Sequence, residues 1–441
     1  MNKEKIIHGF SKLSKKEKLE WIGKTYLGDA TETINDLHRF WMDDSKLQKT
    51  IDNFSENTLS NYILPFGVAP NFLIDDKIYA LPMVTEESSV VAAASSAAKY
   101  WLARGGFRTE VISTKKIGQV HFTWTGKAEK LKAIFDTLKK VLRTEAAYLT
   151  SNMQNRGGGV SDIELKDMTS LEANYYQLFV TFETCDSMGA NFINSVLEQF
   201  AQSLKSFIFS HPHFDKNERN LEIIMAILSN YTPECLVRAW VECPVKDLTQ
   251  VYEGMSPEML AEKFRKAVRV AHIDPYRATT HNKGIFNGID ALVIATGNDF
   301  RAIEACGHTF ASKDGQYRSL SNCTTTAGFF KFWIDIPLAL GTVGGLTHLH
   351  PLAKCALEML GNPKAEELMR IIAAAGLAQN FAALRSLITT GIQRGHMKMH
   401  LANILNHLKA SDKATTAAIT HFEKNAVSMA SVRTFLKEFK A

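Results

Sequence analysis

The chain has 441 residues, of which 45% are hydrophobic and 22% are charged, so wholesale disorder is excluded. The 51 basic and 46 acidic residues leave a net charge of only +5, which argues against nucleic acid as a partner. The six cysteines include no C-x-x-C pair, so neither a disulfide framework nor a metal site is expected. We find no secretory signal and no apolar run of the ~18–20 residues that a spanning helix needs. We therefore expect a cytoplasmic protein without a membrane partner.

The first hundred residues change from polar to apolar along the chain. Residues 1–55 follow the pattern of short polar helices, and residues 62–84 combine strand-like runs with turn residues. Residues 88–102 are small and apolar on every side. A helix of that kind is usually buried, so we expect this one at the centre of a domain.

The next segment predicts a second, smaller unit. Residues 107–125 and 174–184 alternate as strands do, whereas residues 127–151 have an amphipathic helical pattern. Another helix is expected to begin near Met188. Strands and helices mixed in this way indicate a small α+β domain inserted over residues 109–220.

The rest of the sequence is helix-rich, and the fold class predicted for the whole chain is α+β. Residues 1–108 and 221–388 are predicted to form one large domain, which includes a strand at 291–295. Residues 389–441 are predicted to form a C-terminal helical flap, whose first glycines permit movement.

The common site motifs are missing from this sequence. No G-x-G-x-x-G follows a predicted strand, so a Rossmann dinucleotide site is not supported. There is also no P-loop and no G-x-S-x-G elbow of the esterase type. Candidate chemistry therefore has to be sought in less standard clusters.

Two clusters in the sequence concentrate polar groups. Glu86 and Glu87 stand directly before the apolar helix at 88–102, where a carboxylate often only offsets the helix dipole. The segment 274–290 brings arginine, histidine, lysine and asparagine side chains together beside two glycines. An anionic substrate would use such a density of unlike donors.

Three further segments are candidates with simpler explanations. Thr296 to Asp299 follow a predicted strand, where sites often lie, although such a turn needs no function. Asp186 to Asn191 precede a predicted helix, and free N–H groups at a helix start bind phosphate. His396 follows a glycine, but a solitary histidine is more often structural.

Together these segments resemble one family, hydroxymethylglutaryl-CoA reductase of class II, the soluble bacterial type. The resemblance is carried by ALPMVTEESSVVAAAS, DPYRATTHNKGIFNGIDALVIATGND, DSMGAN, GLAQN and GIQRGHM. It extends to ENTLSNYILPFGVAPNF and GTVGGLTHLHPLAK, so it covers nearly the whole chain in order.

The resemblance implies a four-electron reduction of 3-hydroxy-3-methylglutaryl-CoA to mevalonate and CoA with two nicotinamide cofactors, in the mevalonate pathway. In the family pattern Lys283 stabilises the oxyanion, and such a donor is typically worth ~3–4 kcal/mol. Glu87, rather than Glu86, is the proton donor, and His396 protonates the departing CoA thiolate. Asp299 supports the Lys283–Glu87 network. We expect a buried Lys283 ammonium that shares a pocket with these two acids.

The same resemblance implies the binding residues and the assembly. The substrate residues are Arg277, Asn287, Ser89, Asn230 and Gln379. The cofactor residues are Asp186, Met188, Gly189, Ala190 and Asn191, in a small ferredoxin-like domain, together with Thr150. NAD-preferring members carry an aspartate where this chain has Thr150, so NADPH is expected to be preferred over NADH. The family builds its site across a subunit interface, so a homodimer or a larger homo-oligomer is expected.

The sequence also departs from the family pattern and leaves alternatives open. Ser11 replaces an arginine that contacts the CoA phosphate in some members, and neighbouring Lys12 is a substitute. Ser88 replaces a frequent proline beside the catalytic glutamate. Another CoA-thioester enzyme, an acyltransferase or a thioesterase, would need a nucleophile beside a base, and no such arrangement is apparent. A non-catalytic scaffold would not explain the lysine, carboxylate and histidine set.

Overall fold

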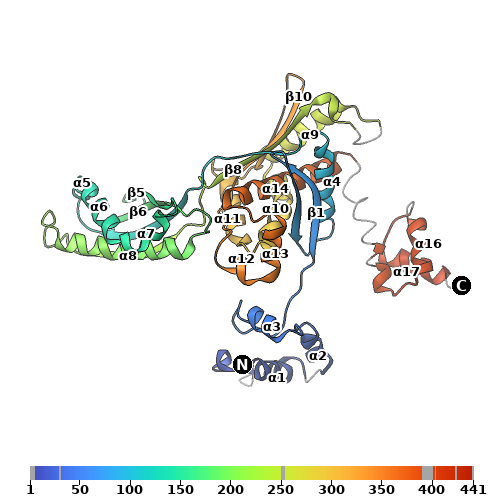
Figure 1. Cartoon of the computed structure of the whole chain (residues 1–441), viewed down its shortest axis with the longest axis horizontal. Coiled ribbons are helices and arrows are strands. Elements are labelled where there is room, and N and C mark those ends of the chain that lie inside the picture. The colour runs from blue at the N-terminus through green and yellow to red at the C-terminus, as the bar shows by residue number, and fades with distance from the viewer. Residues whose placement is uncertain are drawn as a thin grey trace.

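The computed structural model describes residues 5–28, 31–249, 254–389, 401–402, 404–422 and 425–439. Its N-terminal part consists of short helices, as predicted: α1 (Lys15–Tyr26), α2 (Thr31–Arg39) and α3 (Ser45–Asp52). A capping box starts α1, because the Ser14 hydroxyl accepts from the Glu17 N–H at 3.3 Å and the Glu17 carboxylate accepts from the Ser14 N–H at 2.7 Å. These helices lie apart from the sheets (Figure 1).

The central body contains a hairpin, a helix and a four-stranded antiparallel sheet. The hairpin consists of β1 (Phe66–Ile74) and β2 (Lys77–Val84), and it leads into α4 (Val90–Leu102). The sheet has the strand order β3-β8-β10-β9, with β3 (Arg108–Val111), β8 (Leu236–Pro244), β9 (Ser321–Thr326) and β10 (Phe329–Pro337). Helices α10 and α14 lie between this sheet and the hairpin (Figure 1).

The central helix of this body is α14, not the helix at 88–102. The body's helices are α9 (Pro257–Ile273), α10 (Pro275–Ala295), α11 (Phe300–Ala311), α12 (Leu346–Leu349), α13 (Pro351–Met359) and α14 (Ala365–Ile388). Helix α14 is long and apolar enough to cross a membrane, but 78% of its apolar window is buried inside the fold. By contrast, α4 exposes Ala92, Ser96 and Lys99, so the prediction that it is buried on every side is wrong. Its small residues allow close packing on one face against β1 and α14.

A second antiparallel sheet, with its own helices and hydrophobic core, forms the predicted smaller unit. Its strand order is β5-β6-β4-β7, with β4 (Lys116–Trp124), β5 (Gly159–Asp167), β6 (Tyr175–Glu183) and β7 (Leu221–Leu228). The helices are α5 (Ala128–Ala133), α6 (Phe135–Glu145), α7 (Ala147–Gln154) and α8 (Ala190–Ser210). Phe122, Phe182 and Phe200 meet in the core between sheet and helices. Figure 1 shows this unit at one side of the central body.

Three details differ from the sequence-based expectations. The predicted strand at 291–295 is the last part of α10, because a short apolar run suits a buried helix as well as a strand. The helix predicted over 127–151 is divided into short helices that break at Ile134 and Ala146. The smaller sheet continues to Leu228 through β7, beyond the predicted boundary at residue 220, whereas Thr109 pairs with Ala239 in the other sheet.

The described C-terminal residues are largely helical and have a hydrophobic cluster of their own. They include α16 (Asp412–Phe422) and α17 (Met429–Phe439), whose buried side chains include Ala418, Phe422 and Val432. Figure 1 shows these helices at the side of the body opposite to the smaller sheet. The mixed α+β class is therefore confirmed, whereas the flap function of this part remains a prediction.

Candidate active site

Lys283 and Glu87 form an ion pair between two elements that are far apart in sequence. Lys283 lies on α10, and Glu87 lies in the loop between β2 and α4; the Lys283 Nζ to Glu87 Oε2 distance is 2.5 Å. The lysine side chain is 60% exposed and the glutamate side chain 39% exposed. The expectation of a buried ammonium is therefore wrong for a single chain. The Glu87 carboxylate keeps the Lys283 ammonium in position, and the exposed ammonium remains accessible to a ligand or to a second subunit.

Helix α10 arranges polar groups on one face. It begins with Asp274 as its N-cap, whose carboxylate accepts from the Tyr276 N–H at 3.0 Å, and with Pro275 in its first turn. Lys283, Asn287 and Asp290 follow at i, i+4 and i+7, so they share a face of the helix. Glycine at 284 leaves open space beside the lysine, because nothing lies within 4 Å of where its Cβ would be.

Arg277 lies in the first turn of the same helix and lacks an acidic partner. Its side chain is half-buried, and no hydrogen bond or ion pair joins it to any described residue. Burial lowers the pKa of the Arg277 guanidinium from its usual value. A buried charge without a partner is unfavourable, so this position suits a ligand carboxylate.

Asp290 is a further acid at this site to which the sequence analysis gave no role. One of its carboxylate oxygens is buried without a hydrogen-bond partner, and its carboxyl faces Glu304 on α11. Burial, followed by the nearby Glu304, raises the pKa of Asp290 to about 8. Asp290 therefore holds a proton near neutral pH, two helical turns after Lys283 on the same helix.

The predicted substrate residues have different surroundings. Gln379 on α14 is 5% exposed, its Oε1 has no partner among the described residues, and it lies against α10 at Gly288. Ser89 begins α4 with a left-handed φ of 76°. Asn230 is exposed in the segment after β7, and no hydrogen bond or ion pair joins it to the described site residues. The structure thus places Gln379 against α10, whereas Asn230 has no contact of this kind with the described site residues.

Two of the four predicted catalytic residues are not joined to the Lys283–Glu87 pair. Asp299 is the N-cap of α11, where its carboxylate accepts from the N–H groups of Arg301 and Ala302 at 3.1 and 3.2 Å. Within the described residues it makes no hydrogen bond or ion pair with the lysine or the glutamate. His396 lies outside the described residues.

The predicted cofactor residues, Asp186 to Asn191, lead into the start of α8 and contact the central body through Asp186. Gly189 has a φ of 89°, and a side chain there would come within 2.5 Å of Thr184, so only glycine fits. The N–H group of Gly189 donates to no described residue, which leaves it free for an anion, whereas the Met188 N–H faces the segment 341–343, where Ser187 forms a parallel bridge with Val343. Asp186 has a structural contact, because its carboxylate accepts from the Ala365 N–H at the start of α14 at 2.8 Å. Ala190 and Asn191 begin the helix.

Thr150 is turned into the smaller unit rather than toward solvent. It is 3% exposed on α7, and its hydroxyl donates to the Ala147 carbonyl at 3.4 Å. In this conformation the side chain does not present a surface to a cofactor. Ser11, in contrast, is exposed near the N-terminus.

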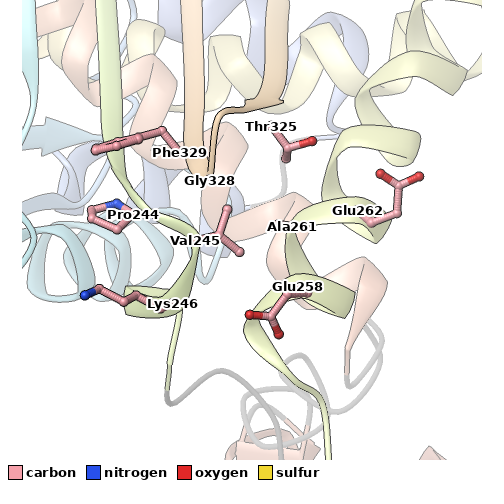
Figure 2. Close-up of a pocket in the computed structure, with 9 residues that line it drawn as sticks. All are labelled: Pro244, Val245, Lys246, Glu258, Ala261, Glu262, Thr325, Gly328 and Phe329. Atoms are coloured by element: carbon pink, nitrogen blue, oxygen red, sulfur yellow. The ribbon is translucent and has the colours of Figure 1, made fainter.

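Two cavities help to locate the site. A cavity of about 270 Å³ lies beside the cofactor turn, and its lining includes Asp186, Thr342, His348 and Lys354. Another of about 660 Å³ lies between the ends of β8 and β10 and the start of α9. Figure 2 shows Glu258 and Glu262 projecting from α9 beside it, and none of the predicted site residues lines it. The first cavity is therefore the one connected to the predicted cofactor residues.

Comparisons with known proteins agree with the motif resemblance. The family model for hydroxymethylglutaryl-coenzyme A reductase matches residues 14–401. The 3-hydroxy-3-methylglutaryl-coenzyme A reductase of Archaeoglobus fulgidus is 38% identical over 399 residues, covering 90% of this chain and 86% of that protein. A probable 3-hydroxy-3-methylglutaryl-coenzyme A reductase of Borreliella burgdorferi is 36% identical over 380 residues, covering 85% and 82%.

Solved structures give the same result. The class II 3-hydroxy-3-methylglutaryl-CoA reductase from Streptococcus pneumoniae, bound to NADPH in open conformations, matches with a TM-score of 0.69 at 35% identity. The match covers 87% of this chain and 99% of that chain. The chain therefore belongs to the hydroxymethylglutaryl-coenzyme A reductase family of oxidoreductases.

Proposed function

We propose that this chain reduces 3-hydroxy-3-methylglutaryl-CoA to mevalonate and CoA, consuming two NAD(P)H and two protons. The observation that supports it most directly is the Lys283–Glu87 ion pair, whose lysine lies on α10, the helix that also carries the unpaired Arg277 guanidinium. A substrate with a carboxylate at one end and a thioester at the other matches these two cations. The same site would catalyse the reverse oxidation, since both directions share their transition states.

Lys283 is proposed to stabilise the negative charge that develops on the carbonyl oxygen at each reduction. Its exposed Nζ already has a hydrogen-bonded partner in Glu87, which holds the ammonium in place and is the proton donor to that oxygen. After the first reduction the hemithioacetal collapses and releases a thiolate, to which His396 gives a proton. Asp299 is proposed to act on this network electrostatically, from its position at the start of α11.

The nicotinamide cofactor is proposed to bind along the turn from Asp186 to Asn191, where it would supply the hydride. The free N–H group of Gly189, directly before α8, suits a pyrophosphate. We propose NADPH as the preferred cofactor, with NADH as the alternative. This preference depends only on the absence of a carboxylate at position 150, which would repel the 2′-phosphate of NADPH. It does not depend on a contact of Thr150 with the cofactor, because the Thr150 side chain is buried.

The exposure of the ion pair supports an oligomeric enzyme. Both partners are open to solvent in one chain, and the space over Gly284 is empty. We propose that a second subunit covers this face in a homodimer or a larger homo-oligomer. The six free cysteines fit a reducing compartment, so the cytoplasm is the proposed location.

The deciding experiment is a turnover assay that follows nicotinamide absorbance and free CoA together. The reductase should oxidise two NADPH for each CoA released. Lys283→Ala should lower kcat/KM by roughly 10²–10³-fold, as loss of an oxyanion donor does. Lys216→Ala, at an exposed loop lysine, is the matched control and should leave turnover unchanged. Release of CoA without oxidation of NADPH would identify a thioesterase or an acyltransferase instead and would refute the proposal.

A further inference from the structure

His281 is a buried histidine on α10 for which the proposed mechanism has no use. It lies two residues before Lys283 and is 1% exposed. Its Nε2 lies 2.6 Å from the hydroxyl of Ser321, the first residue of β9. Its Nδ1 is buried without a hydrogen-bond partner among the described residues. A buried polar atom without a partner is costly, so the unused nitrogen needs an explanation.

A closed ring of hydrogen bonds determines which nitrogen of His281 carries the proton. The Ser321 hydroxyl donates to the Asn380 side-chain oxygen at 2.9 Å, and the Asn380 amide group donates to the His281 carbonyl at 3.3 Å. Because the Ser321 proton is committed to Asn380, the Ser321 oxygen accepts from the His281 ring. This assigns the ring proton to Nε2, so Nδ1 has a free lone pair and is an acceptor.

The surroundings keep this imidazole neutral. Burial, followed by the charges of Arg277 and His272, lowers the pKa of His281 to about 3. At neutral pH the ring therefore adds no positive charge beside the arginine. Its free nitrogen is a neutral acceptor in a place where no carboxylate of the described residues forms an ion pair with Arg277.

The donor that suits this acceptor is Arg277, one turn earlier on the same helix. Residues four apart on a helix are neighbours on one face, and a helical side chain leans toward the N-terminus. The ring of His281 therefore lies over the turn that carries Arg277, which is also the charged group with the strongest influence on it. An unused acceptor and an unpaired, half-buried guanidinium are thus adjacent.

We propose that His281 is a positioning residue for Arg277, whose guanidinium donates one N–H to Nδ1 and directs the others to the substrate carboxylate. The inference rests on the proposed function, in which Arg277 meets that carboxylate. A guanidinium has enough N–H donors to bind a carboxylate with two of them while another is occupied. The contact forms when the carboxylate orders the guanidinium.

A neutral acceptor suits this task better than an acid would. A carboxylate at the place of Nδ1 would hold the arginine, but it would also neutralise the charge and compete with the substrate. The imidazole orients the guanidinium and leaves its charge available. Through Ser321 and Asn380 the ring itself is fixed to β9 and α14, so the position of Arg277 depends on the packing of the central body.

The test compares two substitutions in the full-length enzyme, His281→Gln and His281→Asn. A glutamine amide reaches the place of Nε2 and keeps the link to Ser321, whereas an asparagine amide lies at the place of Nδ1 and keeps the acceptor for Arg277. His281→Gln should raise the KM for 3-hydroxy-3-methylglutaryl-CoA about tenfold, as loss of a hydrogen bond to a charged group does. Its kcat and its KM for NADPH should not change. His281→Asn should keep the KM for the substrate.

The outcomes separate a positioning role from a structural one. A KM that is kept in His281→Gln and raised in His281→Asn would show that only the link to Ser321 matters and would overturn the inference. In an Arg277→Ala background His281→Gln should raise the KM no further, and an additive effect would overturn the inference as well. An equal rise in the KM for NADPH would indicate a general defect of the fold, with the same consequence.

A measurement on the unmodified enzyme decides the question if the variants do not fold. In enzyme labelled with ¹⁵N-histidine, His281 should have a protonated Nε2 and an unprotonated Nδ1. The Nδ1 resonance should shift when 3-hydroxy-3-methylglutarate, the acyl part of the substrate, is added. A proton on Nδ1, or no response to this probe, would overturn the inference. Failure of the unmodified enzyme to reduce the CoA thioester would instead refute the proposed function, and with it the carboxylate that the inference needs.

Discussion

The crossing of α10 and α14 is made by glycines, and alanine at Gly288 tests how tightly it is packed. A Cβ at this position would lie 2.7 Å from the Ala375 carbonyl oxygen and 2.9 Å from the Gln379 Cβ. Gly284, one turn earlier on the same helix, has nothing within 4 Å of its Cβ position. The two substitutions therefore make the same chemical change in opposite surroundings.

The expected magnitudes follow from these contacts. Alanine is favoured over glycine inside a helix by about 0.8–1 kcal/mol, and this gain applies to both variants. At Gly288 the two helices must move apart until the new methyl group reaches ordinary contact distances of ~3.5–4.0 Å from the atoms of α14. Such overpacking costs about 1–3 kcal/mol, and it is the expected difference in unfolding free energy between the two variants.

Thermal and denaturant unfolding followed by circular dichroism measures this difference. Gly284→Ala should be slightly more stable than the unmodified protein, and Gly288→Ala should be less stable than Gly284→Ala. Turnover should fall in both variants. In Gly288→Ala the reason is a shift of α10, and in Gly284→Ala it is the methyl group that enters the open space beside Lys283. Equal unfolding midpoints for the two variants would refute the close packing of the helices.

Three further outcomes are expected. His396→Gln should lose reduction of the thioester but keep reduction of free mevaldehyde, in which no thiolate leaves; equal loss in both assays would reject its role as an acid. Asp290→Asn should remove a pH dependence of stability. The pKa of the Asp290 carboxyl is about 8 in the folded protein, above its ordinary value of 3.8. The carboxyl therefore contributes to stability at low pH, and this contribution is lost as pH rises through 8. The variant should therefore be the more stable protein at pH 9 and no more stable at pH 4, and a constant difference across this range would contradict the assignment. The unmodified enzyme should show a higher kcat/KM with NADPH than with NADH, and a strong NADH preference would refute the cofactor proposal.

The parts of the site that were predictable from sequence are those carried by local patterns. The segment around Lys283 and the glutamates before α4 could be singled out because unlike polar groups cluster there without a structural need. Their pairing across 196 positions could not be worked out from spacing and came from the family resemblance. The exposure of the pair was mispredicted, because burial depends on which surfaces another subunit or a ligand covers.

The remaining errors come from apolar segments and from long-range partners. The apolar run 291–295 suits a buried strand as well as the end of a buried helix, and only the tertiary packing shows that it ends α10. Asp290 ends the polar segment 274–290, but its burial beside Glu304 gave no local signal, because Glu304 lies on another helix. A buried charge is recognisable only after the chain has folded around it.

The two units keep separate hydrophobic cores, and no strand of one sheet pairs with a strand of the other among the described residues. Mutations that retune nicotinamide recognition can therefore accumulate in one core without repacking the other. Such a division would let related enzymes change their nicotinamide cofactor while the substrate-binding residues of the central body stay the same.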